Sequence, residues 1–506
     1  MVILACYLNN KKYEMLIVYK QQKIKNTWGI KMNLSGVNNL EVSSRNEVTP
    51  FGVKDKFGYF LGDLGNDFSF IFASMFLMVF YTKVWGVSAS MVGILFLVSR
   101  CLDAFTDITM GRIVDKCKTT SEGKFRPWIK RMAGPVAISS FLMYQSSLAN
   151  ASMNIKIIVM FVTYILWGSI CYTAINIPYG SMASVITNDP KERASLSTWR
   201  SLGASMASVL IGTFVPQIVY KMDASGNQIV SGSAFTVTAG VFAACSIICY
   251  LVCYKFTTER VKLEVSKKEN ASLGDTFKTL LSNKALLAIL AAAIVLLLSS
   301  LMTQTMNQYL FADYFKNINA LSALSMIGLP INLFLASISV KVASKIGKKE
   351  FSAFGMFLAA TVYIIAYLLK IENAWKYVML YIFGSFGMSI FNMLIWAKIT
   401  DVIDYNEVQF GERNDGVIYG VYSFARKIGQ ALAGGLGGFA LSFIGYNSLA
   451  SVQTAEVAKG IYNISTLFPA VCYLLVGLIL VFAYPLSKKV VEENTKILEA
   501  KRAKNN

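Results

Sequence analysis

Apolar runs of about 20 residues recur along the chain between positions 57 and 486, and they restrict the possible fold more than any other feature. Each run is long enough to cross the roughly 30 Å hydrocarbon core of a bilayer as a helix. Hydrophobic residues make up 55% of the 506 residues, and the mean hydropathy of +0.50 exceeds that of water-soluble domains. The runs are too numerous to be signal peptides. The sequence therefore predicts an all-α integral membrane protein.

The apolar runs predict twelve transmembrane helices in two sets of six. The first six are expected near 57–81, 88–113, 128–148, 155–187, 195–220 and 234–256. The second six are expected near 285–312, 320–344, 351–370, 375–400, 416–445 and 460–485. The predicted units are a disordered cytoplasmic extension at 1–56, a six-helix bundle at 57–256, a central cytoplasmic loop at 257–284, a second bundle at 285–486 and a cytoplasmic tail at 487–506.

Lysine and arginine residues concentrate in alternate loops, and this indicates the orientation, because cytoplasmic loops are enriched in them. They follow the second, fourth and eighth runs, at Lys116, Lys118, Lys124, Arg126, Lys130, Arg131, Lys191, Arg193, Lys345, Lys348 and Lys349. Both termini are therefore expected in the cytoplasm of a cell-membrane protein. These loops, rather than nucleic-acid binding, explain the formal net charge of +19.

The absence of histidine excludes histidine zinc sites, Ser-His catalysis and histidine proton relays. Six of the eight cysteines lie inside apolar runs, so no disulfide framework is expected. The sequence has neither a soluble catalytic domain nor a catalytic cluster at a membrane edge. It therefore predicts no enzyme and no cofactor, and a transported proton or cation would have to be bound by carboxylates.

Charged residues inside the apolar runs are few, and each needs a reason, because a charge at membrane depth costs at least about 2.5 to 3.5 kcal/mol. The candidates for a functional role are Asp63, Asp67, Arg100, Asp103, Asp107, Arg200, Arg426 and Lys427. Two six-helix halves of this kind usually enclose a binding cavity near the middle of the membrane and rock about it, and these charges are the candidates for its functional residues.

Asp103 and Asp107 are the main candidates for a cation site. Their spacing of four residues places both carboxylates on one helix face, with Thr106 beside them. Their repulsion would be relieved by Na⁺ between them or by a proton on one of them, and either event could couple transport. The alternative is a set of static interhelical salt bridges with residues such as Lys427 and Arg200, and the two interpretations can coexist.

Three of the other charges have the chemistry of sugar recognition. Arg200 and Lys427 could donate to sugar hydroxyls or to a uronate carboxylate, and Asp67 could accept from hydroxyls. A separate acidic run lies at the end of the tenth predicted helix, with Asp401, Asp404, Glu407 and Glu412 beside Arg413. It is either a cytoplasmic gate that pairs with the basic loops after helices 2 and 4 or a solvated helix end.

Four motifs, in order, resemble those of the glycoside-pentoside-hexuronide cation symporters, a branch of the major facilitator superfamily. They are Leu102-Asp103-Ala104-Phe105-Thr106-Asp107 with Met110-Gly111, then Gly123-Lys124-Phe125-Arg126-Pro127-Trp128, Asn176-Ile177-Pro178-Tyr179-Gly180 and Asp401-Val402-Ile403-Asp404-Tyr405. The resemblance runs from about Phe57 to Leu486 and implies a major facilitator fold in which a cation and a sugar move together.

The resemblance also implies roles for individual residues. Asp103 and Asp107 are similar to the family's cation-site carboxylates, with Thr173 nearby, and Asp67 is similar to a sugar-binding aspartate. Further sugar-cavity positions are matched by Tyr172, Asn176, Arg200 and Lys427, and Arg413 matches a gating arginine.

Three departures from the melibiose-carrying members limit these roles. Thr106 replaces an asparagine near the sodium site, which leaves Na⁺ and H⁺ both open. Asn176 replaces a sugar-binding aspartate and Gly180 replaces a tryptophan, so the version here looks more like the pentoside and glucuronide members.

The sequence thus favours a symporter that works as a monomer in the lipid bilayer and imports a β-xyloside, xylo-oligosaccharide or glucuronide by alternating access. The alternatives are a lipid or lysolipid transporter of the same fold and a non-transporting membrane sensor.

Overall fold

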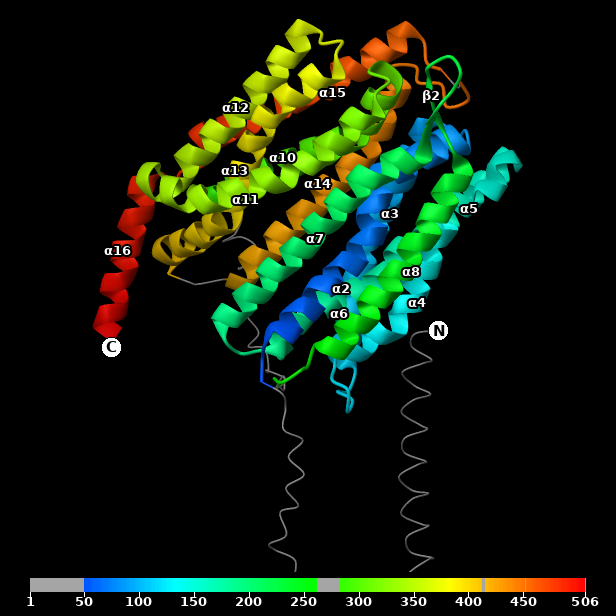
Figure 1. Cartoon of the computed structure of the whole chain (residues 1–506). Helices are drawn as coiled ribbons and strands as arrows, with labels where there is room; N and C mark the ends of the chain where they lie inside the picture. The colour runs from blue at the N-terminus through cyan, green and yellow to red at the C-terminus, as the bar shows by residue number, and fades with distance from the viewer. Residues whose placement is uncertain (1–49, 262–281, 412–414, 451, 506) are drawn as a thin grey trace, which may run out of the picture.

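The computed structural model describes residues 50–261, 282–411, 415–450 and 452–505, which are almost entirely helical (Figure 1). Most of the predicted extension at 1–56 and of the predicted loop at 257–284 lies outside these ranges. Glu412 and Arg413 of the predicted gate also lie outside them.

The first six helical segments form the N-terminal half. They are α2 (Val53–Phe72) with the π-helical turns η1 (Ala73–Leu77) and η2 (Phe80–Val84), α3 (Ala89–Lys116), α4 (Arg126–Leu142), α5 (Met153–Ile165) continued by η4 (Leu166–Tyr172) and α6 (Thr173–Ile186), α7 (Pro190–Val219) and α8 (Gly232–Phe256). A 3-10 turn, η3 (Ser146–Asn150), follows α4, and the antiparallel strands β1 (Tyr220–Met222) and β2 (Gln228–Val230) join α7 to α8.

The second six segments form the C-terminal half. They are α10 (Lys284–Tyr309) with η5 (Leu310–Tyr314), α11 (Ile318–Ile346), α12 (Lys348–Leu369), α13 (Ala374–Phe410), α14 (Asp415–Phe443) and α15 (Ala455–Leu478) with η6 (Ile479–Ala483). A last helix, α16 (Lys488–Asn505), packs against α13 and α12. Side chains of Asn283, Asn317, Asn373 and Thr454 cap the starts of α10, α11, α13 and α15, as short polar residues commonly do.

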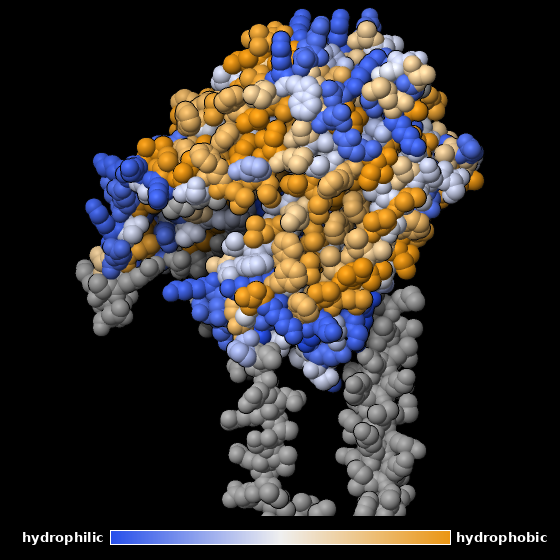
Figure 2. Space-filling model, viewed as in Figure 1, coloured by the Kyte–Doolittle hydropathy of each residue, from blue (hydrophilic) through white to orange (hydrophobic). Residues whose placement is uncertain are grey.

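Each of these twelve long segments of the described ranges overlaps one of the twelve predicted spans. Nine helices of the described residues are long and apolar enough to cross a membrane by length and composition alone. The other three are α2, α4 and α14. Of these, α4 has only 17 residues, and α2 and α14 carry charged residues such as Asp63, Asp67, Arg426 and Lys427. Figure 2 shows an apolar band between two polar ends, as expected for a protein that spans a bilayer.

The two halves pack along α3 with α14 and along α7 with α11. Gly93 of α3 meets Gly435 and Gly438 of α14 so closely that a Cβ on Gly93 would lie 2.8 Å from the Gly435 carbonyl oxygen. Small residues allow helices to approach in this way within a membrane.

Polar contacts between the halves close one end of the molecule, which we call the hairpin end because β1 and β2 lie there (Figure 1). Lys83 Nζ lies 2.6 Å from Asp313 Oδ1, and the Thr82 and Tyr309 hydroxyls are 2.8 Å apart. The Gln217 amide also donates to the Ser322 hydroxyl over 3.0 Å.

The opposite end, at which α2 begins and α8 ends, is the terminal end. Within the N-terminal half it is held by Glu259, whose carboxylate accepts from the backbone N–H groups of Lys124, Phe125 and Arg126 over 2.7 to 2.8 Å. A carboxylate at the first turn of α4 also interacts favourably with the positive end of the helix dipole.

Candidate functional site

A cavity of about 1050 Å³ lies between the halves. Figure 2 shows the surface hollowed between them on the side of the terminal end. All eight charges that the sequence places at membrane depth line this cavity: Asp63, Asp67, Arg100, Asp103, Asp107, Arg200, Arg426 and Lys427. The cavity therefore gathers four carboxylates and four cations, as the cost of exposing charge to lipid requires.

Eight of the nine predicted cation-binding and sugar-binding residues line the cavity. They are Asp67, Asp103, Asp107, Tyr172, Thr173, Asn176, Arg200 and Lys427. The ninth, Thr106, is not among the lining residues, and its hydroxyl donates to the backbone carbonyl of Asp103, three residues earlier, over 3.2 Å. Eight of the predicted residues therefore lie together around the cavity, whereas the Thr106 hydroxyl contacts the backbone of its own helix.

Two hydroxyls from the neighbouring helical segment face the two carboxylates of α3. Ser169 Oγ lies 2.6 Å from Asp103 Oδ1, and Thr173 Oγ1 lies 2.9 Å from Asp107 Oδ1. Both the carboxylates and the hydroxyls are spaced by four residues, so the two Asp-hydroxyl pairs stack one turn apart. Ser169 lies in the π-helical turn η4, a distortion that is frequent at functional sites.

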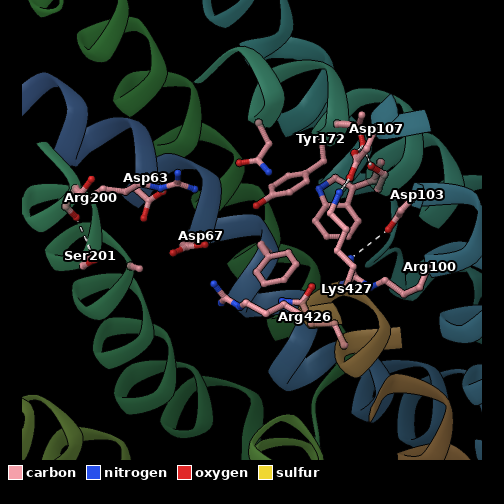
Figure 3. Close-up of a pocket in the computed structure, with 18 of the residues that line it drawn as sticks. Asp63, Asp67, Arg100, Asp103, Asp107, Tyr172, Arg200, Ser201, Arg426 and Lys427 are labelled. Carbon is pink, nitrogen blue, oxygen red and sulfur yellow. Dashed lines mark hydrogen bonds and ion pairs between the residues drawn. The ribbon is translucent and has the colours of Figure 1, made fainter. Parts of the chain in front are cut away.

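Each of these carboxylates also contacts one cation (Figure 3). Arg100 Nη1 lies 3.1 Å from Asp103 Oδ2, and Lys427 forms an ion pair with the other oxygen of Asp107. The Lys427 contact joins α14 of one half to α3 of the other. Lys427 therefore forms a salt bridge to this pair of carboxylates, whereas Arg200 instead pairs with Asp63, at 3.0 Å.

The predicted sugar-binding residues lie on the N-terminal side of the cavity, except for Lys427. The Arg200 guanidinium sits 5.3 Å from the centre of the Tyr179 ring as well as beside Asp63. Asp67 is one turn from Asp63 and only 9% exposed. The Tyr172 ring stacks on Phe70 with centroids 5.6 Å apart, and stacking of this kind fixes the ring at the cavity wall.

The predicted gate residue Asp401 contacts its own half of the molecule in this structure. Lys348 Nζ, at the start of α12, lies 2.6 Å from Asp401 Oδ1. Asp404 follows on the next turn of α13, and Arg413 lies outside the described residues. Pairing of the acidic run with the loops after α3 and α6 would require the terminal end to close, so the gate stays a prediction.

The sequence reasoning missed several residues that lie in or beside the cavity. Ser169 could have been found from its spacing to Thr173, which repeats the spacing of Asp103 and Asp107. Trp167 and Gln430 also line the cavity, but neither lies in a pattern that distinguishes it from packing residues.

The residue pattern of the family described as MFS/sugar transport protein matches residues 58–488. The uncharacterized symporter YjmB of Bacillus subtilis (strain 168) is 32% identical over 437 residues, which are 86% of this chain and 93% of that protein. The glucuronide carrier protein homolog of Escherichia coli (strain K12) is 30% identical over the same shares of both chains.

Among solved structures, the D-xylose-proton symporter superposes with a TM-score of 0.62 at 12% identity, covering 86% of this chain and 98% of that chain. At this identity the likeness shows the fold alone, which is that of a major facilitator transporter. The resemblance in the four motifs is thereby confirmed, and the relatives are transporters rather than enzymes. The chain belongs to the MFS/sugar transport protein family, in the branch that resembles the glycoside-pentoside-hexuronide symporters.

Proposed function

We propose that this protein is a cation-coupled sugar symporter that works by alternating access, with its terminal end in the cytoplasm. The observation that carries the proposal is the pair of stacked carboxylate-hydroxyl contacts, Asp103 with Ser169 and Asp107 with Thr173, beside the cavity. Oxygen atoms of this kind are the ligands that hard cations prefer, and a carboxylate of such a pair could equally hold a proton.

The ion pair between Lys427 and Asp107 suggests how the cation and the sugar are coupled. Lys427 supplies the positive charge at Asp107 while the transported cation is absent. A cation bound between Asp103 and Asp107 would weaken this ion pair and release the ammonium group toward the cavity, where it can donate to the sugar. Because the ion pair joins α14 to α3, its loss also removes a contact between the halves.

The cavity is suited to a polar cargo. Its volume of about 1050 Å³ lies at the upper end of ordinary ligand pockets and leaves room for more than one sugar ring. Eight charged side chains around it do not favour the tail of a lipid or lysolipid. We propose a β-xyloside, xylo-oligosaccharide or glucuronide as the cargo, and the glucuronide carrier homolog among the relatives supports the last of these.

The orientation proposal rests on the basic loops. Lys124, Arg126 and Lys130 lie at the terminal end, beside the end of α8, and Lys348 and Lys349 begin α12 at the same end. Positive residues in short loops favour the cytoplasmic side. In this orientation the structure is closed to the outside and open to the cytoplasm.

Reconstitution tests the proposed function. Purified protein in lipid vesicles should accumulate radiolabelled xylobiose or a glucuronide when an inward Na⁺ gradient or an inward proton gradient is imposed. Vesicles that carry the Arg112→Gln variant, whose exposed side chain lies outside the cavity lining, should behave like the wild type. Uptake that ignores both gradients would refute the coupling.

A further inference from the structure

We propose that Arg426 on α14 binds an acidic group of the substrate, so that the cargo of this transporter is an anionic sugar. The inference rests on the proposed function and concerns the same cavity. The inference favours a sugar with a carboxylate or a sulfonate group over a neutral xyloside. The cation site alone does not distinguish between these two kinds of cargo.

The inference begins with the balance of charge in the cavity. Six of its eight charged side chains form three ion pairs: Asp63 with Arg200, Asp103 with Arg100, and Asp107 with Lys427. Asp67 and Arg426 make no hydrogen bond or ion pair with any described residue. They are therefore the two cavity charges whose polar atoms remain available to a ligand.

These two residues lie on opposite walls. Asp67 belongs to α2 of the N-terminal half and Arg426 to α14 of the C-terminal half. Figure 3 shows both side chains pointing into the space between the halves, on the side of the cavity away from Asp103 and Asp107. A ligand that spans the cavity would therefore meet a carboxylate at one end and a guanidinium at the other.

The surroundings of Arg426 form a subsite. Tyr422 precedes it and Gln430 follows it by four residues, which places all three on one face of α14. The Trp396 ring meets the Tyr422 ring edge-on at 5.3 Å between centroids. Arg426, Trp396 and Tyr422 also line a smaller cavity of about 130 Å³. The guanidinium thus lies where the main cavity adjoins a smaller one with aromatic walls.

The chemistry of a guanidinium decides which ligand suits this subsite. Its planar set of N–H donors matches a carboxylate or sulfonate with two parallel hydrogen bonds, and it cannot accept any. Water can solvate Arg426 while the cavity is open. When the cavity closes around a neutral sugar, the charge loses this water without gaining an anion, and an unpaired buried charge is costly. An acidic sugar removes that cost.

The opposite wall fixes the orientation of the ligand. When ionised, Asp67 accepts hydrogen bonds but cannot donate any. It therefore suits sugar hydroxyls and repels an acidic group. Asp63, one turn away, is already paired with Arg200, so Asp67 supplies the uncompensated negative charge on that side. The substrate should therefore present its hydroxyls to α2 and its acidic group to α14.

Four p-nitrophenyl glycosides test the inference by equilibrium binding to the purified full chain. The β-D-glucuronide carries a carboxylate on the sugar ring, its methyl ester has similar size without the charge, the β-D-glucoside has a hydroxymethyl group there, and the β-D-xyloside has hydrogen. A charge-assisted hydrogen bond contributes about 1.5 to 3 kcal/mol, so we expect the wild type to bind the glucuronide about tenfold or more tighter than its methyl ester.

Two variants assign this preference to Arg426. Arg426→Gln should lose the preference for the glucuronide while binding the methyl ester and the glucoside at least as tightly as the wild type does, because the unpaired charge is gone. Arg426→Lys should keep part of it, because an ammonium retains the charge without the planar donors. Arg112→Gln, which removes an exposed arginine outside the cavity lining, should leave all four affinities unchanged.

The outcomes separate this inference from the proposed function. Equal binding of the glucuronide and its methyl ester by the wild type would overturn the role of Arg426 and leave sugar transport standing. The same conclusion would follow if Arg426→Gln weakened the binding of all four ligands alike, or if it left the preference unchanged. If no glycoside binds the wild type under any cation condition, the proposed function itself fails.

Discussion

The ion pair that closes the hairpin end allows a quantitative prediction about the balance between conformations. Lys83 Nζ lies 2.6 Å from Asp313 Oδ1, and the two side chains are only 10% and 6% exposed. The pair joins η2 of one half to η5 of the other, so it is lost when this end opens. Replacing Lys83 by Met leaves the Asp313 carboxylate with the Tyr446 hydroxyl, at 3.5 Å.

The magnitude follows from the burial of this ion pair. Removing one partner of a buried pair costs about 3 to 5 kcal/mol, and we take about 3 kcal/mol because both side chains keep some exposure. The cost falls on the conformation that is closed at the hairpin end. Since about 1.4 kcal/mol corresponds to a factor of ten, the open fraction should rise about a hundredfold.

Thiol labelling measures this fraction. Ser322 is 6% exposed at the hairpin end and would be replaced by Cys in a chain whose eight native cysteines have been removed. When closing is fast compared with labelling, the labelling rate is proportional to the open fraction. Lys83→Met should therefore raise the rate about a hundredfold, and the exchanged pair Lys83→Asp with Asp313→Lys should restore slow labelling.

A control and a refuting result complete this test. A cysteine in place of Ser225, which is exposed in the β1–β2 turn, should label at the same rate in every background. If Lys83→Met leaves the labelling of the cysteine at position 322 unchanged, the ion pair does not hold this end closed.

Three further predictions concern stability and packing. Gly438→Ala places a methyl group against the α3 backbone and should impair uptake and lower the melting temperature, whereas Gly420→Ala, with open space around it, should do neither. Glu259→Gln weakens the carboxylate cap of α4 and should cost about 1 to 3 kcal/mol in thermal unfolding; an unchanged melting temperature would contradict this. Lys398 is fully buried, and its Nζ donates to the Ser352 hydroxyl over 3.0 Å but forms no ion pair among the described residues. Because an unpaired buried charge is costly, Lys398→Met should raise the melting temperature. A lower melting temperature would show that the ammonium group stabilises the fold.

The sequence predicts the helices of this protein well because bilayer thickness sets their length. Each of the twelve segments of the two halves overlaps a predicted span, although the third ends at Leu142 and is followed by a separate 3-10 turn, where the prediction ran to 148. The π-helical turn at Leu166–Tyr172 could not be predicted, because no local pattern distinguishes it from the α-helix around it.

The position of the site could also be predicted, but not its pairing. The eight charges singled out as candidates all line the cavity, because exposure to lipid is costly for them. The partner of each depends on which side chains of distant helices meet. Arg200 reaches Asp63 rather than Asp103 or Asp107, and Thr106 turns to its own backbone. The contact of Lys83 with Asp313 joins residues 230 positions apart, so no sequence pattern reveals it.

The coupling role of Asp103 and Asp107 is tested most directly by measuring whether vesicles accumulate sugar against the sugar's concentration gradient. The wild type, Asp103→Asn, Asp107→Asn and Asp115→Asn would be compared under the Na⁺ and proton gradients that drive uptake. Asp115 lies on the same helix with an exposed side chain outside the cavity lining, so its variant controls for the loss of a carboxylate. We expect the wild type and Asp115→Asn to accumulate sugar, and Asp103→Asn and Asp107→Asn to lose accumulation. Full accumulation by either of the last two variants would contradict the assignment of the cation site.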